Sequence, residues 1–190
     1  MIEDVKYMEL FPVNFTRVVL DIDHDKILDY TLNFVNNIDS YTTYHDSEIN
    51  QEWRKGLDEL DRLEEDIVES AKRMCKHTDR RLTDPILITM WASVYNNKKG
   101  HGSHIHRRSL ISGTYYPVGN EDHSSIQFES PYYNYCMHDT IDEKHLNKSF
   151  KPTKGDMLMW PSWLNHRVWQ QQPTEHPRVA ISFNVDSKRA

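Results

Sequence analysis

The most constraining feature of the sequence is a series of short β-branched and aromatic segments in its second half. Polar turn segments separate them, and no long helical pattern lies between them. Many short antiparallel strands are typical of a sandwich, and a double-stranded β-helix, or jelly roll, is one closed form of it. The segments, which all follow Pro85, are ILITMWASVYNN, SLISGTYYPV, SSIQFES, GDMLMWP and RVAISFNV.

The first half of the chain predicts two helices. Asp23 is a suitable N-cap, and the apolar residues from Ile27 to Ile38 keep near-helical spacing. From Leu57 to Met74, apolar residues recur at intervals of three and four, with acidic residues on the opposite face. Helices followed by strands predict an α+β, mainly β fold, with helical support over about residues 23–76.

Two stretches have weaker patterns. Residues 40–56 are interpreted as a loop with one or two short turns, anchored in the core by Trp53. Residues 7–21 contain short apolar runs broken by Pro12, which predicts one or two edge strands.

Length and charge limit the class of protein. A chain of 190 residues predicts a single domain over residues 1–190, with a β core over about 86–186. The net charge of −6 argues against a dedicated nucleic-acid binder. The basic stretch NNKKGHGSHIHRR is equally well explained as a solvated loop and as a patch that draws in an anionic ligand.

Cysteine usage and the N-terminus indicate the compartment. Cys75 and Cys136 have no CxxC partner, which fits free thiols in a reducing environment. The N-terminal residues have no leader pattern, and no apolar run is long enough to span a membrane. We therefore expect a cytoplasmic protein.

Three histidines crowd the stretch HGSHIHRRSLISGTYYP. Residues two apart on a strand share a face, so His104 and His106 would project together. Such a pair can bind a metal through two neutral imidazoles, which suit Fe, Zn, Cu or Ni. His101 would face away from the pair in an unbroken strand and is the weaker candidate. Solvated surface histidines are the simpler alternative.

A third imidazole and a basic strand follow. His166 comes just after a strand that ends at Pro161, so it would lie at a sheet end. In RVAISFNV, Arg178 and Ser182 share one face, opposite a fully apolar face. A guanidinium binds a carboxylate bidentately, and a hydroxyl can add a hydrogen bond. The pattern favours a pocket for a ligand carboxylate; pairing of Arg178 with one of the chain's own acids is the alternative.

Four motifs together resemble the Fe(II)/2-oxoglutarate-dependent oxygenase superfamily, and most closely its small prolyl-hydroxylase-like branch in bacteria and phages. HIHRRSLISGTYY is similar to its H-x-H, short loop and SGxYY strand, and GDMLMWPSWLNHRV to its G-x-L-x-x-F/W-P-S-x-x-x-H segment. The interval from His166 to Arg178 and the ending RVAISFNV also match. The likeness runs from about Trp91 to Val185, about half of the chain.

The resemblance implies a fold and a set of cofactors. It implies a double-stranded β-helix with N-terminal helices packed on one sheet. It implies Fe(II) bound by His104 and His166, with 2-oxoglutarate as co-substrate chelating the iron through its 1-carboxylate and keto oxygen. Arg178, with Ser182 and a strand tyrosine, would bind the 5-carboxylate. Tyr115 and Tyr116 have opposite parity, so only one can face the pocket, and Tyr115 is slightly favoured.

The third metal ligand stays open. The superfamily usually has Asp or Glu where this chain has His106. His106 can ligate, giving a three-His site; a carboxylate such as Asp156 or Glu121 can take its place; or water or an anion can fill the position. Strand geometry aims His106 the same way as His104, which favours the first reading. A neutral third ligand would weaken Fe(II) binding.

The function implied is an Fe(II)- and 2-oxoglutarate-dependent dioxygenase, with His104, His106 and His166 as the catalytic metal ligands. With O2 it would hydroxylate a C–H bond of a peptide side chain or small metabolite and release succinate and CO2. One alternative is a three-His, cupin-like dioxygenase that does not use 2-oxoglutarate. Another is a non-enzymatic jelly-roll binding module with incidental or zinc-holding histidines. Residues 130–154 are long for a connection, which suggests either a substrate-contacting loop, with Tyr132, Tyr133 and Tyr135 as the contacts, or an ordinary crossing loop.

Overall fold

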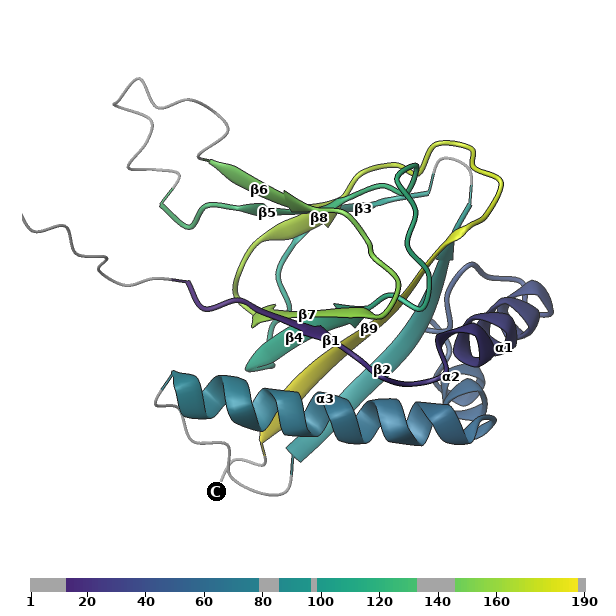
Figure 1. Ribbon diagram of the computed structural model, residues 1–190, viewed down its shortest axis with the longest axis horizontal. Helices are drawn as coiled ribbons and strands as arrows, with labels where there is room; N and C mark the ends of the chain where they lie inside the picture. Colours follow the sequence, from purple (N-terminus) through teal and green to yellow (C-terminus); the bar gives the residue numbers. More distant parts are fainter. Residues whose placement is uncertain (1–12, 79–85, 97–98, 133–145, 188–190) are drawn as a thin grey trace, which may run out of the picture.

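The computed structural model describes residues 13–78, 86–96, 99–132 and 146–187 (Figure 1). Three helices and nine strands lie in these ranges. The helices are α1 (His24–Asn36), α2 (Ser47–Lys55) and α3 (Asp58–His77). The strands are β1 (Thr16–Val19), β2 (Ile86–Tyr95), β3 (His101–His104), β4 (Ile111–Tyr115), β5 (Ile126–Glu129), β6 (Asn147–Phe150), β7 (Asp156–Pro161), β8 (His166–Val168) and β9 (Arg178–Ser187).

The strands form two antiparallel sheets that face each other (Figure 1). The five-stranded sheet has the order β1-β7-β4-β9-β2, and the four-stranded sheet has the order β3-β8-β5-β6. The chain crosses repeatedly between them, so that β4 lies between β7 and β9, and β8 between β3 and β5. The predicted α+β, mainly β double-stranded β-helix is confirmed, and each of the five strand-like segments after Pro85 forms a strand.

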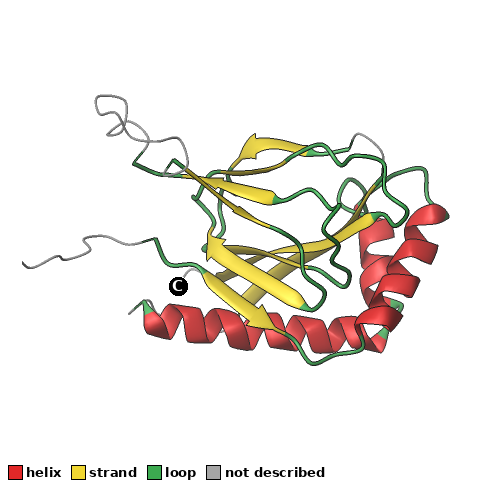
Figure 2. Ribbon diagram, turned by 45° about the horizontal axis from the view of Figure 1, so that its top comes forward, coloured by secondary structure: helices red, strands yellow, loops and turns green. Residues whose placement is uncertain are grey.

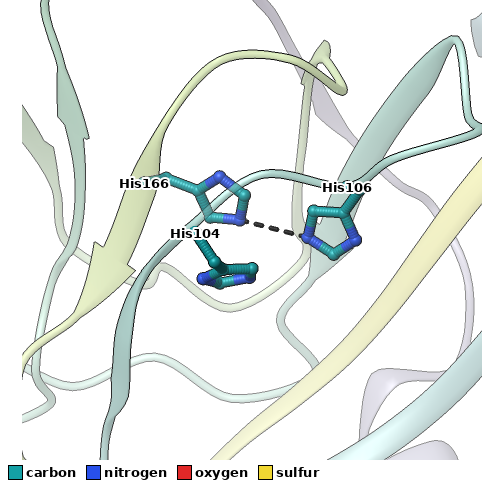
Figure 3. Close-up of side chains that lie close together, drawn as sticks. All are labelled: His104, His106 and His166. Atoms are coloured by element: carbon teal, nitrogen blue, oxygen red, sulfur yellow. Dashed lines mark hydrogen bonds between the residues drawn. The ribbon is translucent and has the colours of Figure 1, made fainter.

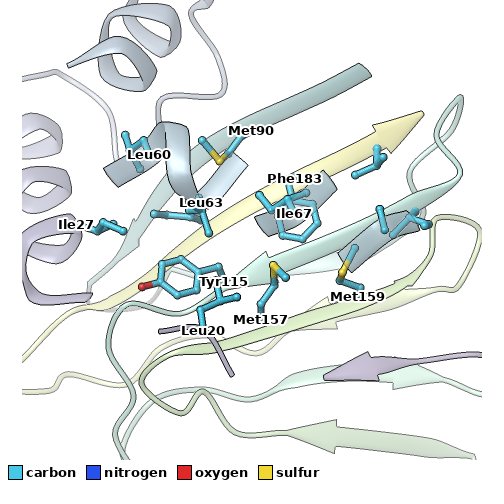
Figure 4. Packing of buried hydrophobic residues seen from close by; sticks show 14 of the residues in the cluster. Leu20, Ile27, Leu60, Leu63, Ile67, Met90, Tyr115, Met157, Met159 and Phe183 are labelled. Carbon is cyan, nitrogen blue, oxygen red and sulfur yellow. The ribbon is translucent and has the colours of Figure 1, made fainter. Parts of the chain in front are cut away.

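Helix α3 lies along the outer face of the five-stranded sheet, and α1 and α2 pack near its end (Figures 1 and 2). Leu60, Leu63 and Ile67 of α3 are fully buried because their spacing puts them on one side of the helix. They pack toward Met90 of β2 and Phe183 of β9 (Figure 4). Burying one such side chain contributes about 1.5–3 kcal/mol. The helices therefore occupy one face of this sheet and leave the other face to the interior between the sheets.

The N-terminal elements follow the predicted pattern. The carboxylate of Asp23 accepts a hydrogen bond from the Lys26 backbone N–H at 3.0 Å, which caps α1 where the sequence places its start. Among the described strands, β1 pairs with β7 alone and is an edge strand, as predicted. The part of the predicted edge region before Val13 lies outside the described residues.

Residues 47–55 differ from prediction: they form helix α2 rather than short turns in a loop. The Asp46 side chain accepts hydrogen bonds from the backbone N–H groups of Glu48 (2.9 Å) and Ile49 (3.0 Å). Only Ile49 and Trp53 are apolar in this helix, so the hydrophobic pattern was too thin to reveal it. Trp53 is fully buried, which confirms its predicted role as the anchor.

Residues 130–154 also differ from the prediction of one long connection, because their end forms β6, which pairs with β5. Phe150 is the only apolar residue of β6, which explains the weak strand signal. Its ring stacks on Phe15 with centroids 4.6 Å apart. Tyr133 and Tyr135, suggested as substrate contacts, lie outside the described residues.

Gly113 of β4 supports a first prediction. A Cβ at this position would lie 2.2 Å from the Phe183 ring and 2.7 Å from the Leu158 carbonyl oxygen, so the packed sheet and core must shift to accept it. We expect Gly113→Ala to lower the free energy of unfolding by about 1–3 kcal/mol in urea denaturation. The control is Gly102→Ala, whose Cβ has no heavy atom within 4 Å. Equal stabilities of the two variants would contradict this packing.

Candidate metal centre

Three imidazoles converge at one end of the space between the sheets (Figure 3). His104 ends β3 and pairs directly with His166 at the start of β8, while His106 follows two residues after β3. Ring centroids lie 4.3 Å apart for His104 and His166, and 5.1 Å apart for His106 and His166. One nitrogen from each ring lies within 4.8 Å of the other two, so the group could hold one metal ion.

Backbone contacts orient the rings. Nδ1 of His166 donates a hydrogen bond to the Leu164 carbonyl at 2.9 Å, and Nδ1 of His104 donates to the Gly102 carbonyl at 2.8 Å. A carbonyl can only accept, so Nδ1 carries the proton and Nε2 keeps its lone pair. The Nε2 atoms of His106 and His166 lie 3.3 Å apart. This is the tautomer and orientation that metal-binding histidines adopt.

Burial keeps the imidazoles uncharged. It lowers the pKa of His166 to about 3 and that of His106 to about 4, and it also lowers the pKa of His104. The neighbouring rings lower the pKa of His106 and His166 further. All three are neutral near pH 7, the form in which imidazole binds metals.

His101 lies closer to the group than an unbroken strand would place it. The register of β3 against β8 shifts between His101 and His104. As a result, the His101 ring packs edge-on against His104, with centroids 4.0 Å apart. His101 is nevertheless not one of the three residues whose nitrogens converge.

Neither carboxylate considered for the third position lies at the histidines. Asp156 is buried in β7 and pairs with Arg17, with Oδ2 2.8 Å from Nη2. Glu121 is exposed, and its backbone carbonyl accepts a hydrogen bond from Lys151. Among the residues that the structure describes, the cluster contains imidazoles only. The backbone N–H of His106 donates to the Ser162 carbonyl at 2.9 Å, which holds this residue beyond the end of β3.

The histidines line a cavity of about 350 Å³ that reaches across to Arg178. Arg178 is only 1 % exposed. Its Nε donates to the Ser124 carbonyl at 3.1 Å, and its Nη2 donates to the Tyr116 hydroxyl at 3.2 Å. Nη1 is buried and has no hydrogen-bond partner within the described ranges. A buried cationic donor without a partner is costly, so the guanidinium has an unused capacity to bind an anion.

Tyr95 and Tyr116 flank this guanidinium. The sequence analysis did not consider Tyr95, and it preferred Tyr115 to Tyr116. The Arg178 guanidinium lies 4.8 Å from the Tyr95 ring centroid and 5.2 Å from that of Tyr116. Tyr95 faces it because Tyr95 and Arg178 are paired residues of β2 and β9. This register, and the approach of the Ser124 carbonyl, became visible only in the fold.

The expectation that Tyr115 faces the pocket is wrong. Its hydroxyl lies 2.7 Å from Nδ1 of His24 in α1, on the helix-covered side of the sheet (Figure 4). Tyr116 lines the cavity instead. Residues 107–110 form an irregular connection that includes Arg108 at a φ of 67°. Tyr116 is ten positions after His106, so the parity count from His106 agrees with the structure across this connection, and the preference for Tyr115 went against it.

Ser182 faces the same cavity as Arg178, as the strand alternation predicted. It pairs with Trp91 of β2 and Thr114 of β4, however, and not with the residues around the guanidinium. Ser182 is four positions after Arg178 in an extended strand, which puts their backbones about 13 Å apart. The hydroxyl thus lies nearer the Trp91 end of the cavity.

Solved structures share this fold. The non-heme alpha ketoglutarate dependent epimerase SnoN from nogalamycin biosynthesis matches with a TM-score of 0.67 and 12% identity, over 92% of this chain and 77% of that chain. A prolyl-4-hydroxylase from Pseudomonas putida matches with a TM-score of 0.59 and 11% identity, over 93% and 86%. HygX from Streptomyces hygroscopicus, with nickel and 2-oxoglutarate bound, matches with a TM-score of 0.61 and 10% identity, over 93% and 83%. The fold is therefore that of jelly-roll oxygenases.

A match to a family sequence model identifies the family of this chain. The model of the family described as "Putative 2OG-Fe(II) oxygenase" matches residues 89–184, half of the chain, and this range contains the three histidines and Arg178. The chain belongs to this 2OG-Fe(II) oxygenase family. A search of curated protein sequences found no match. In the described ranges, no helix is long and apolar enough to cross a membrane.

The lowered pKa values give a second prediction. In the unfolded chain these imidazoles titrate near 6.5. In the folded, metal-free protein, NMR titration should place the midpoints of His106 and His166 near 4 and 3, respectively. The folded state then binds fewer protons than the unfolded state, so stability should fall as the pH drops from about 6.5 through these values. Midpoints near 6.5 for both rings in the folded protein would contradict the burial of the site.

Proposed function

We propose that this oxygenase hydroxylates a C–H bond of a small metabolite or a peptide side chain, in a reaction that depends on Fe(II) and 2-oxoglutarate. One observation carries the proposal: one cavity has three neutral imidazoles at one end and a buried guanidinium with an unpaired Nη1 in its wall. The first group fits a divalent metal, and the second fits the carboxylate of an organic acid.

The metal ligands in this proposal are His104, His106 and His166. Three neutral nitrogen donors fit Fe(II), and their backbone hydrogen bonds hold Nε2 of His104 and His166 free. The apolar rings of Trp160 and Phe128 surround His166, at centroid distances of 4.9 and 5.8 Å. This shell limits the access of water to the centre.

The co-substrate in this proposal binds along β9. Arg178 donates from Nη1 to the 5-carboxylate of 2-oxoglutarate, and the Tyr116 hydroxyl helps to hold the guanidinium in place. Ser182 contacts the ligand nearer the histidines, since its strand position is too far along β9 to share the same carboxylate. Tyr116 replaces Tyr115, which faces α1.

When bound, the iron and 2-oxoglutarate supply the activation of O2 and the oxidative decarboxylation that yields succinate and CO2. The protein contributes binding, orientation and exclusion of water. Arg178, His104 and His166 lie in paired strands, and a backbone hydrogen bond to Ser162 holds His106, so their relative positions are fixed before a ligand arrives.

Two other functions would use this site differently. A three-His, cupin-like dioxygenase without 2-oxoglutarate has no need of the buried cation of Arg178. A binding module that uses zinc structurally would take up metal without consuming O2. The family match over half of the chain favours the oxygenase over both.

Metal binding provides a third prediction. We expect His166→Ala to abolish binding of Mn(II), an O2-stable substitute for Fe(II), in calorimetric titrations of untagged protein. His106→Asp should bind the ion more tightly than the parent chain because a carboxylate adds a negative charge. His77→Ala, in the exposed last turn of α3, is the control and should bind normally. Unchanged Mn(II) affinity in the His166 variant would place the metal elsewhere.

A fourth prediction concerns 2-oxoglutarate. Arg178→Gln should raise the apparent KM for 2-oxoglutarate in substrate-uncoupled succinate formation by about 30-fold or more, since it removes a buried charged partner of the carboxylate. Tyr116→Phe should raise it less, because the guanidinium keeps its Ser124 contact. Arg167→Gln is the control, since Arg167 stacks on the exposed Trp169 and does not line the cavity. Equal KM values for 2-oxoglutarate in all variants would contradict the role of Arg178, whereas O2 consumption without succinate formation would favour the cupin-like alternative.

A further inference from the structure

An aromatic surface leads from the histidines to the mouth of the cavity. Trp91 of β2 stacks on His106, with centroids 6.1 Å apart and planes inclined by 30°. The Tyr44 ring lies next to Trp91, with centroids 4.9 Å apart. Tyr44 is 60 % exposed although it lines the same cavity. We call Tyr44 and Trp91 the aromatic wall.

The exposure of Tyr44 does not come from a loose loop. The preceding residues are bonded to the edge of β2: Thr43 N–H donates to the Ala92 carbonyl at 3.1 Å, and the Thr42 hydroxyl donates to the same carbonyl at 2.7 Å. The Val94 N–H donates to the Tyr41 carbonyl at 2.8 Å. Residues 41–43 are thus fixed, and they hold an exposed aromatic ring at the cavity mouth.

The aromatic wall is separate from the end of the cavity that holds the guanidinium. Trp91 and Tyr95 share one face of β2 and lie four residues apart, about 13 Å along the strand. Tyr95 contacts Arg178, whereas Trp91 contacts His106. A ligand on the wall would therefore lie beside the metal ligands and leave Arg178 to the co-substrate.

The charge of the cavity is opposite to that of the chain. The net charge of the chain is −6, yet the described residues that line the cavity include Arg107 and Arg178 and no carboxylate. With three neutral imidazoles, a divalent metal, the dianion of 2-oxoglutarate and Arg178, the loaded site would carry a charge of +1 before Arg107 at the mouth is counted. A second anion would bring the site toward neutrality.

We infer that the aromatic wall and Arg107 bind a small substrate that carries a flat ring and an anionic group. The ring stacks on Tyr44 and Trp91, and the anion pairs with Arg107. The cavity of about 350 Å³ also holds 2-oxoglutarate, so the substrate is a small molecule or one side chain and not an extended segment of protein. This inference rests on the proposed function.

The test uses benzenesulfonate as the probe, with the full chain loaded with Mn(II) and 2-oxoglutarate in the absence of O2. Ligand-detected NMR titrations give its Kd. Two matched probes separate the features: cyclohexanesulfonate keeps the charge without the flat ring, and benzyl alcohol keeps the ring without the charge. We expect benzenesulfonate to bind without displacing 2-oxoglutarate, and both matched probes to bind about threefold to tenfold more weakly.

Variants locate the probe. Tyr44→Ala and Arg107→Gln change exposed side chains, and each should raise the Kd of benzenesulfonate by about threefold to tenfold. The control variants are Trp169→Ala and Arg167→Gln, an aromatic–cation pair outside the cavity with centroid and guanidinium 4.1 Å apart. They should leave the Kd unchanged.

The outcomes separate the inference from the proposed function. Three results would overturn the inference alone. Benzenesulfonate does not bind to the loaded protein, 2-oxoglutarate displaces it, or the Tyr44 and Arg107 variants bind it with the same Kd as the parent chain. Loading is measured first by calorimetry. If Mn(II) and 2-oxoglutarate do not bind, the proposed function fails and the inference fails with it.

Discussion

The two faces of strand β9 lie in different environments, and the organisation of the site depends on the alternation of its side chains. Ile181, Phe183 and Val185 pack into the core covered by α3, while Arg178 and Ser182 face the cavity. β9 also lies between β4 and β2 and fixes the register of both. A slip of one residue would turn the guanidinium into the apolar core and the apolar side chains into the cavity. The core and the ligand site therefore specify the same register.

Electrostatics connects the two ends of the cavity. Burial keeps the imidazoles neutral, and it surrounds Arg178 with two aromatic rings and one carbonyl in place of a carboxylate. A buried guanidinium loses several kcal/mol of hydration that these contacts only partly replace. The site is thus prepared for a dication at one end and for an anion at the other. The same reasoning explains why a third imidazole in place of a carboxylate leaves the loaded centre more positive.

Sequence periodicity was sufficient for most elements and faces but not for contacts between separate elements. The H-x-H pair predicted that His104 and His106 project together, and the alternation of β9 predicted that Arg178 faces the pocket; the geometry agrees with both, while the roles of these residues stay predictions. The choice of Tyr115 over Tyr116 failed because it went against the parity count from His106, which the structure follows across the connection before β4. The contacts of Arg178 depend on strand register and on a passing carbonyl, neither of which has a local signal. Helix α2 was missed because it has only two apolar residues, too few to define a helical hydrophobic pattern. The single-domain organisation and cytoplasmic location stay predictions.

The most direct measurement is a crystal structure of the protein grown without O2 in the presence of Mn(II) and 2-oxoglutarate. The predicted result is one metal ion bound by Nε2 of His104, His106 and His166, with the 5-carboxylate of 2-oxoglutarate on Nη1 of Arg178. A metal ion bound away from these rings would contradict the proposed site, as would a 2-oxoglutarate molecule that leaves the guanidinium unpaired.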